Sequence, residues 1–281
     1  MTDLNRVQTI AIEAAKAAAE VLQSFSKRRA ELVIDHKGRN DLVSQADRLA
    51  EQACLNVLKR DTPEYGIVAE ETGGKPSSGA TWYIDPLDGT TNYLHGIPQY
   101  AVSIGLIGHA GSPDQDGLPL DVDTPLVAVV YDPCRDEMFT AIRGAGARMN
   151  GVPIHCSSTT EFSQALLGTG LPFRDYSFTE EYMPALKDAI HLTRGIRRNG
   201  AAALDLAWVA CGRFDGYWEM GLAPWDVAAG TLLVREAGGI VEDLRGKHSW
   251  PIDGNIVSGN TAVEPKLFDM VRPYLNPLAS R

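Results

Sequence analysis

Cysteine is scarce in this sequence, and its placement excludes several classes of protein. The 281 residues include four widely separated cysteines with no CxxC pair: Cys54, Cys134, Cys156 and Cys211. Secreted domains that depend on disulfides are usually short and dense in cysteine, so we expect a reducing compartment. The six histidines show no HExxH or related spacing that would indicate a zinc site.

Positive charge and long apolar runs are also in short supply. Lysine and arginine number 26 against 36 aspartates and glutamates, which gives a formal net charge of -10. Nucleic acid and anionic membranes both attract clustered positive charge, so we expect direct binding to neither. No apolar run approaches the length of a membrane span, and the N-terminus lacks the positive-then-apolar order of a signal peptide. We therefore expect a cytoplasmic protein.

The apolar pattern predicts helices and strands in one continuous fold. Alanine-rich helical spacing predicts a long amphipathic helix over residues 3–29. Strand-like segments joined by turn signals predict an antiparallel meander over residues 100–154. No repeat or clear linker interrupts the chain, so we expect a single domain over 1–281. A change from meander to alternating elements marks a soft subdivision into an N-terminal α+β half, 1–150, and a C-terminal α/β half, 151–281.

The most informative stretch is Trp82-Tyr83-Ile84-Asp85-Pro86-Leu87-Asp88-Gly89-Thr90-Thr91-Asn92-Tyr93. An apolar run typical of a buried strand ends in Asp85 and Asp88, and the pair Gly89-Thr90 follows. Magnesium prefers carboxylate and water oxygens together with substrate phosphate. Backbone N–H groups at a helix start or nest attract phosphate oxygens. The stretch therefore suits a site for divalent cations and a phosphate.

Three further carboxylates occur in similar contexts. Glu70 follows a short apolar strand, Asp226 opens a helix, and Asp47 lies near the start of a helix predicted over 45–59. Side chains at strand ends and helix starts can converge at one edge of a sheet. A single carboxylate at such a place is more often a cap or an ion-pair partner, and Asp-Pro and Asp-Gly are common turn dipeptides. The residue pattern alone leaves both readings open.

Taken together, the motifs resemble those of the inositol monophosphatase family. Glu70-Glu71-Thr72, followed by the stretch that begins at Trp82, resembles the first signature of the family. Trp225-Asp226-Val227-Ala228-Ala229-Gly230, with Glu236-Ala237-Gly238-Gly239 behind it, resembles the second. The resemblance runs in order through essentially the whole chain.

Two other regions extend this resemblance. Lys37 and the segment 41–47 resemble the upstream metal-site segment of the family. In the second half, 197–200, 219–222 and 255–260 are most similar to the bacterial SuhB-type branch.

The resemblance implies a fold and a chemistry. The fold would be an α+β or α/β layered αβαβα sandwich of the inositol monophosphatase and fructose-1,6-bisphosphatase type. The chemistry would be Mg²⁺-dependent, lithium-sensitive hydrolysis of a small phosphate monoester, with two or three Mg²⁺ ions. A homodimer is also implied, although nothing in the residues themselves indicates one.

Site residues carry over position by position. Glu70, Asp85 and the Leu87 carbonyl would hold a first Mg²⁺, and Asp85 would bridge to a second ion completed by Asp88 and Asp226. Glu70 and Thr90 would orient the attacking water, and Asp47 would assist through a weaker third ion. The implied set of substrate-binding residues is Asp88, Gly89, Thr90, Arg197, Glu219 and Asp226. Arg197 and Glu219 stand equally well as structural ion-pair partners.

General chemistry agrees with this division of labour. A metal pair can activate water and clamp the entering and leaving oxygens of an in-line displacement, so no covalent nucleophile is needed. A cysteine phosphatase would need a phosphate loop with a downstream arginine, and none of the four cysteines has that context. A phosphoaspartate mechanism would want an early Asp-x-Asp, which the sequence lacks.

Several alternatives remain open at this level. The first reading is hydrolysis of myo-inositol 1-phosphate, a phosphorylated polyol; histidinol phosphate, 3′-phosphoadenosine 5′-phosphate and fructose 1,6-bisphosphate would use the same metal residues. The SuhB-type resemblance also implies a partner of the transcription antitermination machinery, for which catalysis would be dispensable. The excursion 109–124 is longer than expected for its hairpin, and it could alter oligomer contacts or cover the site.

Overall fold

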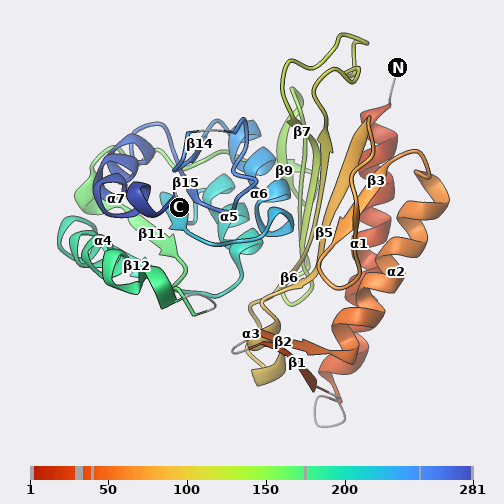
Figure 1. Cartoon of the computed structure of the whole chain (residues 1–281), viewed down its shortest axis with the longest axis horizontal. Helices are drawn as coiled ribbons and strands as arrows, with labels where there is room; N and C mark the ends of the chain where they lie inside the picture. The colour runs from red at the N-terminus through yellow and green to blue at the C-terminus, as the bar shows by residue number, and fades with distance from the viewer. Residues whose placement is uncertain (1–2, 29–33, 39–40, 174–175, 247, 280–281) are drawn as a thin grey trace.

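The two larger β-sheets and three pairs of helices alternate in five layers in this computed structural model (Figure 1), and a third sheet of two short strands lies beside them. The structure describes residues 3–28, 34–38, 41–173, 176–246 and 248–279. Helices α1 and α2 cover the outer face of the larger sheet, α5 and α6 fill the space between the sheets, and α4 and α7 cover the far face of the smaller sheet. The predicted αβαβα sandwich is thus confirmed.

The N-terminal part builds the first helix pair and the larger sheet. Its elements are α1 (Leu4–Ser26), β1 (Ile34–Gly38), β2 (Asp41–Ser44), α2 (Gln45–Asp61), β3 (Gly66–Ala69), β4 (Gly73–Lys75), β5 (Ala80–Asp88), α3 (Thr90–His95), β6 (Ala101–Gly108), β7 (Thr124–Asp132), β8 (Glu137–Ile142), β9 (Gly146–Met149) and β10 (Val152–Pro153). The eight strands of the larger sheet lie in the order β10-β9-β8-β7-β6-β5-β3-β4. Strands β5 to β9 pair antiparallel with their sequence neighbours, as the meander prediction requires, whereas β3 and β5 are parallel.

The C-terminal part builds the smaller sheet and the remaining helices. Its elements are β11 (Leu166–Thr169), α4 (Thr179–Leu192), β12 (Gly195–Arg197), α5 (Ala202–Ala210), β13 (Gly216–Glu219), α6 (Pro224–Glu236), β14 (Ile240–Asp243), β15 (Ile256–Gly259) and α7 (Glu264–Ala279), with short 3-10 turns at Phe162–Gln164 and Tyr176–Phe178. The five strands lie in the order β12-β11-β13-β15-β14. No helix in the described part of the chain is long and apolar enough to cross a membrane.

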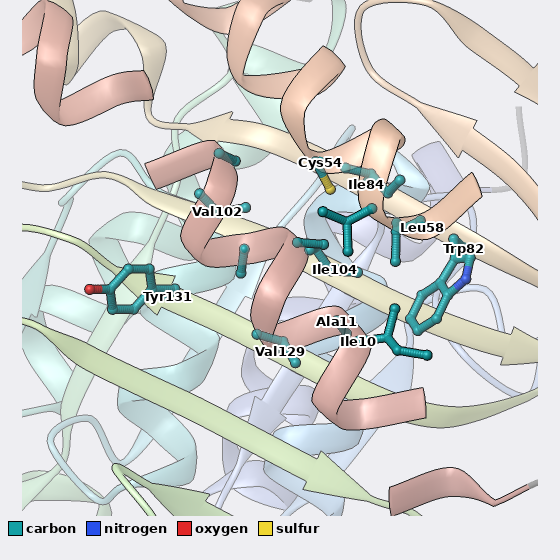
Figure 2. Close-up of a cluster of buried hydrophobic side chains, with 14 of the residues drawn as sticks. Ile10, Ala11, Cys54, Leu58, Trp82, Ile84, Val102, Ile104, Val129 and Tyr131 are labelled. Carbon is teal, nitrogen blue, oxygen red and sulfur yellow. The ribbon is translucent and has the colours of Figure 1, made fainter. Parts of the chain in front are cut away.

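Helix α1 shows why the outer layer lies so close to the sheet. The Asp3 carboxylate accepts hydrogen bonds from two N–H groups of the first turn and starts the helix. Ile10 and Ala11 belong to its buried stripe, which otherwise consists largely of alanine. Figure 2 shows this stripe against Ile104 and Val129 of the sheet. Small side chains let the helix backbone approach the strands closely.

Strand β5 is buried on both faces. Trp82 and Ile84 point toward α1 and α2, whereas Tyr83 points toward α5 and α6. Successive side chains of a strand alternate between the two faces, so a strand between two helix layers needs apolar residues at every position. The continuous apolar run that precedes Asp85 therefore has a direct structural cause.

Two local predictions differ from the structure. A polar turn is predicted over 35–40, but Ile34–Gly38 forms strand β1, because it pairs antiparallel with β2. The segment 194–198 is predicted only to lead into a helix, but Gly195–Arg197 forms the parallel edge strand β12 beside β11. Both strands are short and polar, so pairing with a neighbour rather than residue type decides their state. The strand predicted at 32–34 falls largely outside the described residues.

The excursion between β6 and β7 lies at the far end of the sheet from the aspartate motif. Ala80 of β5 pairs with Gly108 beside the excursion, whereas Asp88 pairs with Ala101. The length of β5 separates these two ends by roughly 26 Å. The His109 ring lies 2.7 Å from the Thr81 hydroxyl, and the excursion rises above the sheet on the side opposite α3 (Figure 1). It therefore does not cover the site.

Gly105 sets the distance between the larger sheet and α6. A Cβ atom at Gly105 would lie 2.8 Å from both the Ala228 Cβ and the Ala229 backbone nitrogen. Real Cβ contacts are essentially never this short, so any side chain here would push α6 away. Because α6 also carries Asp226, this contact helps to place the site.

We expect Gly105→Ala to lower the free energy of unfolding by about 1–3 kcal/mol, since the added methyl group overpacks a sheet–helix contact that cannot relax freely. Chemical denaturation monitored by circular dichroism measures this. Gly79→Ala is the matched control, because a Cβ there meets nothing within 4 Å. Equal effects of the two substitutions would contradict the proposed spacing role.

Candidate metal and phosphate site

Three buried carboxylates from two elements meet at one end of the larger sheet. Asp85 and Asp88 come from β5 and Asp226 from α6, and an oxygen of each lies within 4.8 Å of an oxygen of the others. Their side chains are at most 7% exposed. The predicted convergence of Asp226 with the aspartate motif is therefore what the structure shows.

A bulge in β5 lets both of its aspartates face this point. In regular pairing, residues three apart on a strand point to opposite faces. Between Asp85 and Asp88 the strand advances three residues, while β6 advances only two, from Ser103 to Ala101. Such a bulge redirects side chains locally. The Leu87 N–H then donates to the Asp85 carboxylate at 2.9 Å, which stiffens the turn.

Asp88 also sits on the N-terminus of α5. The backbone N–H groups of Ala202 and Ala203 donate to its two carboxylate oxygens at 3.1 and 2.8 Å. No side chain of α5 itself caps these donors. Unsatisfied N–H groups and the positive end of the helix dipole both favour a negative charge there. Asp88 thus ties the middle helix layer to the larger sheet.

Asp226 is held by its own helix. Its carboxylate accepts a hydrogen bond from the Ala223 N–H at 2.8 Å, and Pro224 occupies the first helical position, where a missing N–H costs nothing. The arrangement fixes the first turn of α6 next to β5.

Close packing of these acids shifts their pKa values. Burial raises the pKa of Asp85 well above its usual range, and the negative charges of Glu70, Asp88 and Asp226 raise it further. Burial and the charge of Asp226 raise the pKa of Asp88 to about 8, even though the α5 N–H groups act in the opposite direction. A divalent cation between the carboxylates would relieve this repulsion, so the donor set fits a hard cation such as Mg²⁺.

Glu70 joins the cluster because its strand is parallel to β5. Ala69 is paired with Ile84, so the next residues, Glu70 just after β3 and Asp85 within β5, lie side by side. The Glu70 N–H continues the pairing by donating to the Ile84 carbonyl at 3.1 Å. Both side chains line the same cavity.

Thr90 connects the aspartate motif to Asp47. The Thr90 hydroxyl lies 3.1 Å from both the Asp47 carboxylate and the Leu87 carbonyl. The other Asp47 oxygen accepts hydrogen bonds from the N–H and hydroxyl of Ser44, at 2.9 and 2.5 Å. Burial raises the pKa of Asp47 despite these contacts. The first-turn position predicted for Asp47 in α2 is observed, and so is its approach to the site.

Both the backbone conformation and the close packing at Gly89 exclude a side chain. Its φ of 94° lies in the left-handed region, and a Cβ would come within 2.9 Å of the Gln99 carbonyl oxygen. The backbone beside Thr90 can therefore approach a ligand closely.

A cavity of about 650 Å³ opens over this cluster. The acids and Thr90 form its floor, and the upper wall combines Glu219 with apolar side chains. These apolar residues are Leu171, Pro172, Phe173, Phe178, Met220 and Leu222. The volume is typical of a small-molecule site.

The structure does not bring Arg197 to this cavity. Arg197 ends β12, its side chain is exposed, and its guanidinium turns back to the Ile196 carbonyl at 3.0 Å. Arg198 lines the cavity instead, with its guanidinium 5.1 Å from the centre of the Phe173 ring. Successive side chains of extended backbone point to opposite sides, so choosing between two adjacent arginines requires the strand register.

The sequence pattern alone does not predict the roles of Asn92 and Arg198 at the site. Asn92 donates hydrogen bonds to the carbonyls of Gln99 and Asn199, at 2.8 and 2.7 Å, and so joins α3 to the loop before α5. Arg198 carries the same side chain as Arg197, so residue type alone does not distinguish the two. For Lys37, whose backbone lies in β1, the side chain is outside the described part of the structure.

Fold and site together define a class of protein: a five-layered α+β protein with a buried cluster of three acids that could hold a metal ion. The chain belongs to the inositol monophosphatase family, whose family model matches residues 3–275.

Curated relatives and solved structures agree with this assignment. The chain is 42% identical to the Nus factor SuhB of Pseudomonas aeruginosa and 39% identical to that of Escherichia coli K12, each covering 97% of this chain and 98% of the relative. The crystal structure of suhB from Bartonella henselae superposes with a TM-score of 0.85 at 38% identity, over 95% of this chain and 98% of that one. An Anabaena (Nostoc) inositol monophosphatase superposes with a TM-score of 0.78 at 38% identity, over 100% of both chains.

Burial of Asp88, together with repulsion from Asp226, predicts a pH-dependent stability in chelator. The folded-state pKa of Asp88 is about 8, above the value of 3.8 for a free carboxyl, so the folded state binds more protons between these pH values. The free energy of unfolding should therefore fall as pH rises from about 4 to about 8, by a few kcal/mol. We expect Asp88→Asn to flatten this fall in denaturant titrations, because the amide cannot ionise.

The control for this experiment is Asp116→Asn, which removes an exposed carboxylate of the 109–124 excursion. An unchanged slope for Asp88→Asn, or an equal change in the control, would show that the ionisation of Asp88 does not govern the pH dependence.

Proposed function

We propose that this protein is a Mg²⁺-dependent phosphatase that hydrolyses myo-inositol 1-phosphate to myo-inositol and phosphate. The observation that carries the proposal is the meeting of Asp85, Asp88 and Asp226, buried within 4.8 Å of one another on the floor of a cavity. Family membership and the match to an inositol monophosphatase structure support the same reaction. We further propose a cytoplasmic homodimer.

Each acid has a place in this proposal. Glu70, Asp85 and the Leu87 carbonyl would hold one Mg²⁺, and Asp85, Asp88 and Asp226 a second, with Asp47 available to a third. Bound Mg²⁺ would supply positive charge that lowers the pKa of water and stabilises the developing charge on phosphate and leaving oxygen.

Residues of the chain would do the remaining work. The backbone N–H groups around Gly89 and Thr90 would bind the phosphate oxygens. Because the Thr90 hydroxyl lies within hydrogen-bond distance of Asp47, its lone pairs are oriented to accept a hydrogen bond from water. Glu70, on the adjacent strand end, would accept the other hydrogen and so align the water for in-line attack. Glu219 on the cavity wall would accept a hydrogen bond from a hydroxyl of the leaving alcohol.

A second candidate function rests on the curated relatives. Several relatives at about 40% identity are named Nus factor SuhB. We therefore keep a role as a partner of the transcription antitermination machinery as the alternative. The acidic net charge of -10 favours a protein partner over RNA as its direct contact.

We expect activity to require Mg²⁺ and to be inhibited by Li⁺. Asp226→Asn should lower kcat/KM for inositol 1-phosphate at least about 1000-fold, because it removes a charged ligand of a catalytic metal pair. Asp243→Asn, which alters another buried carboxylate after the same helix, should change kcat/KM less than about 10-fold. Phosphate release assays measure both, and equal losses or full activity in chelator would contradict the mechanism.

A substrate panel tests the leaving alcohol. Inositol 1-phosphate should give a higher kcat/KM than histidinol phosphate, 3′-phosphoadenosine 5′-phosphate or fructose 1,6-bisphosphate. Negligible turnover of inositol 1-phosphate beside rapid turnover of another ester would reassign the substrate while leaving the chemistry intact.

Asp88→Asn separates the two candidate functions. It should abolish phosphate release, since Asp88 belongs to the proposed metal pair. If the protein acts in antitermination, the same variant should still support readthrough of a terminator in a reconstituted transcription assay. Loss of readthrough in a variant that remains folded by circular dichroism would link the two functions.

A further inference from the structure

Two neighbouring strands of the smaller sheet carry complementary patterns beside the cavity. Gly168-Thr169-Gly170 lies at the end of β11, and Tyr217-Trp218-Glu219 lies on β13. The strands are parallel, with Gly168 paired to Tyr217 and Thr169 to Trp218. Alternation therefore places the two glycines on one face with Tyr217 and Glu219.

Each glycine makes room for one of these side chains. A Cβ at Gly168 would lie 2.9 Å from the Phe214 ring and 3.0 Å from the Tyr217 ring. A Cβ at Gly170 would lie 1.8 Å from the Glu219 carboxylate. Neither glycine has a positive φ, so the conformation of the backbone does not require glycine here. The requirement is space for the tyrosine ring and the carboxylate.

Tyr217 holds the Glu219 carboxylate directly. The Tyr217 side chain is completely buried, and its hydroxyl donates a hydrogen bond to the Glu219 carboxylate. Burial, and then the negative charge of Glu219, raise the pKa of Tyr217 well above its usual value, so it stays a protonated donor.

The support beneath Glu219 is itself anchored. The Tyr182 hydroxyl donates to the Gly170 carbonyl at 2.8 Å and lies 2.7 Å from the Thr169 hydroxyl. Both side chains are buried. These hydrogen bonds therefore restrict movement of the backbone at Gly170, which lies against the Glu219 carboxylate.

We propose that Tyr217 is a positioning residue that, in the space left by Gly168 and Gly170, fixes the Glu219 carboxylate at the cavity wall so that the site selects phosphate esters of polyhydroxylated alcohols. The inference rests on the proposed phosphatase function and adds the residue that holds Glu219 in place for it. An ionised carboxylate only accepts hydrogen bonds. A leaving group without a hydroxyl at this place leaves that acceptor without the substrate contact, and sites built for a hydroxyl discriminate strongly against analogues that lack it.

The fixed orientation matters because a glutamate has several rotamers of similar energy. Once the Tyr217 hydroxyl is removed, the carboxylate samples orientations that do not meet the substrate, and the contact costs more to form. An ester with no hydroxyl on its leaving group forms no hydrogen bond with Glu219, so removal of the Tyr217 hydroxyl does not alter its hydrolysis.

Kinetics with two esters tests the proposal. For Tyr217→Phe we expect KM for inositol 1-phosphate to rise about 10-fold, as expected for a weakened hydrogen bond to a charged group, while KM and kcat for phenyl phosphate change less than 2-fold. Gly170→Ala should act in the same way, because its methyl group displaces the carboxylate. Tyr131→Phe, which removes another hydroxyl that donates to a carboxylate, Asp136, is the matched control and should alter neither ester.

Crystal structures of Tyr217→Phe and Gly170→Ala provide a readout that does not depend on turnover. A displaced or doubled Glu219 carboxylate supports the proposal, and an unchanged one overturns it. Equal losses for both esters, or no loss for either, also overturn it. If the wild-type protein hydrolyses neither ester, the phosphatase function fails, whereas the position of Glu219 in the variants still decides whether Tyr217 holds it.

Discussion

The repulsion among buried carboxylates is the constraint on which the rest of the structure depends. Oxygens of Asp85, Asp88 and Asp226 lie within 4.8 Å of one another, and each residue is at most 7% exposed. Burying several negative charges together without a cation is energetically unfavourable. Backbone N–H groups stabilise this arrangement: those of Leu87, Ala202 and Ala203, together with that of Ala223, each donate to one of the acids. What repulsion they leave unbalanced is the force that would draw a divalent cation into the cavity.

The packing of the helix and sheet layers brings the site residues together. The middle helices α5 and α6 must reach β5 with their N-termini, and the alanines and glycines of the contact surfaces let them approach closely. The Asp88 carboxylate of β5 accepts hydrogen bonds from the N-terminus of α5, and Asp226 lies in the first turn of α6. These contacts connect the larger sheet to the central helix layer. The smaller sheet then supplies the opposite wall, with Glu219 held by Tyr217. In the proposed mechanism, the metal-binding acids therefore come from the larger sheet and α6, whereas the residue that recognises the alcohol comes from the smaller sheet.

Much of this could be predicted from residue patterns. The amphipathic helices, the meander and the strand that leads into Asp85 follow from local periodicity, and the motif resemblance points to Glu70, Asp88 and Asp226. Short strands with polar residues, such as β1 and β12, could not be predicted in this way. Their extended state depends on pairing with a neighbouring strand, and local periodicity does not reveal that pairing. The prediction of Arg197 at the site, where the structure places Arg198, was wrong for a related reason: choosing between the two requires the orientation of one short strand.

The sequence by itself determined which acids are present, the periodicity that buries them, and the family to which their order belongs. Tertiary structure decided how they act. A one-residue bulge turns Asp85 and Asp88 to the same point, parallel pairing sets Glu70 beside Asp85, and the register of β11 with β13 places two glycines against Tyr217 and Glu219. These relations join residues that are distant in the chain, and hydrogen-bond register and close packing, which no local pattern encodes, hold them there.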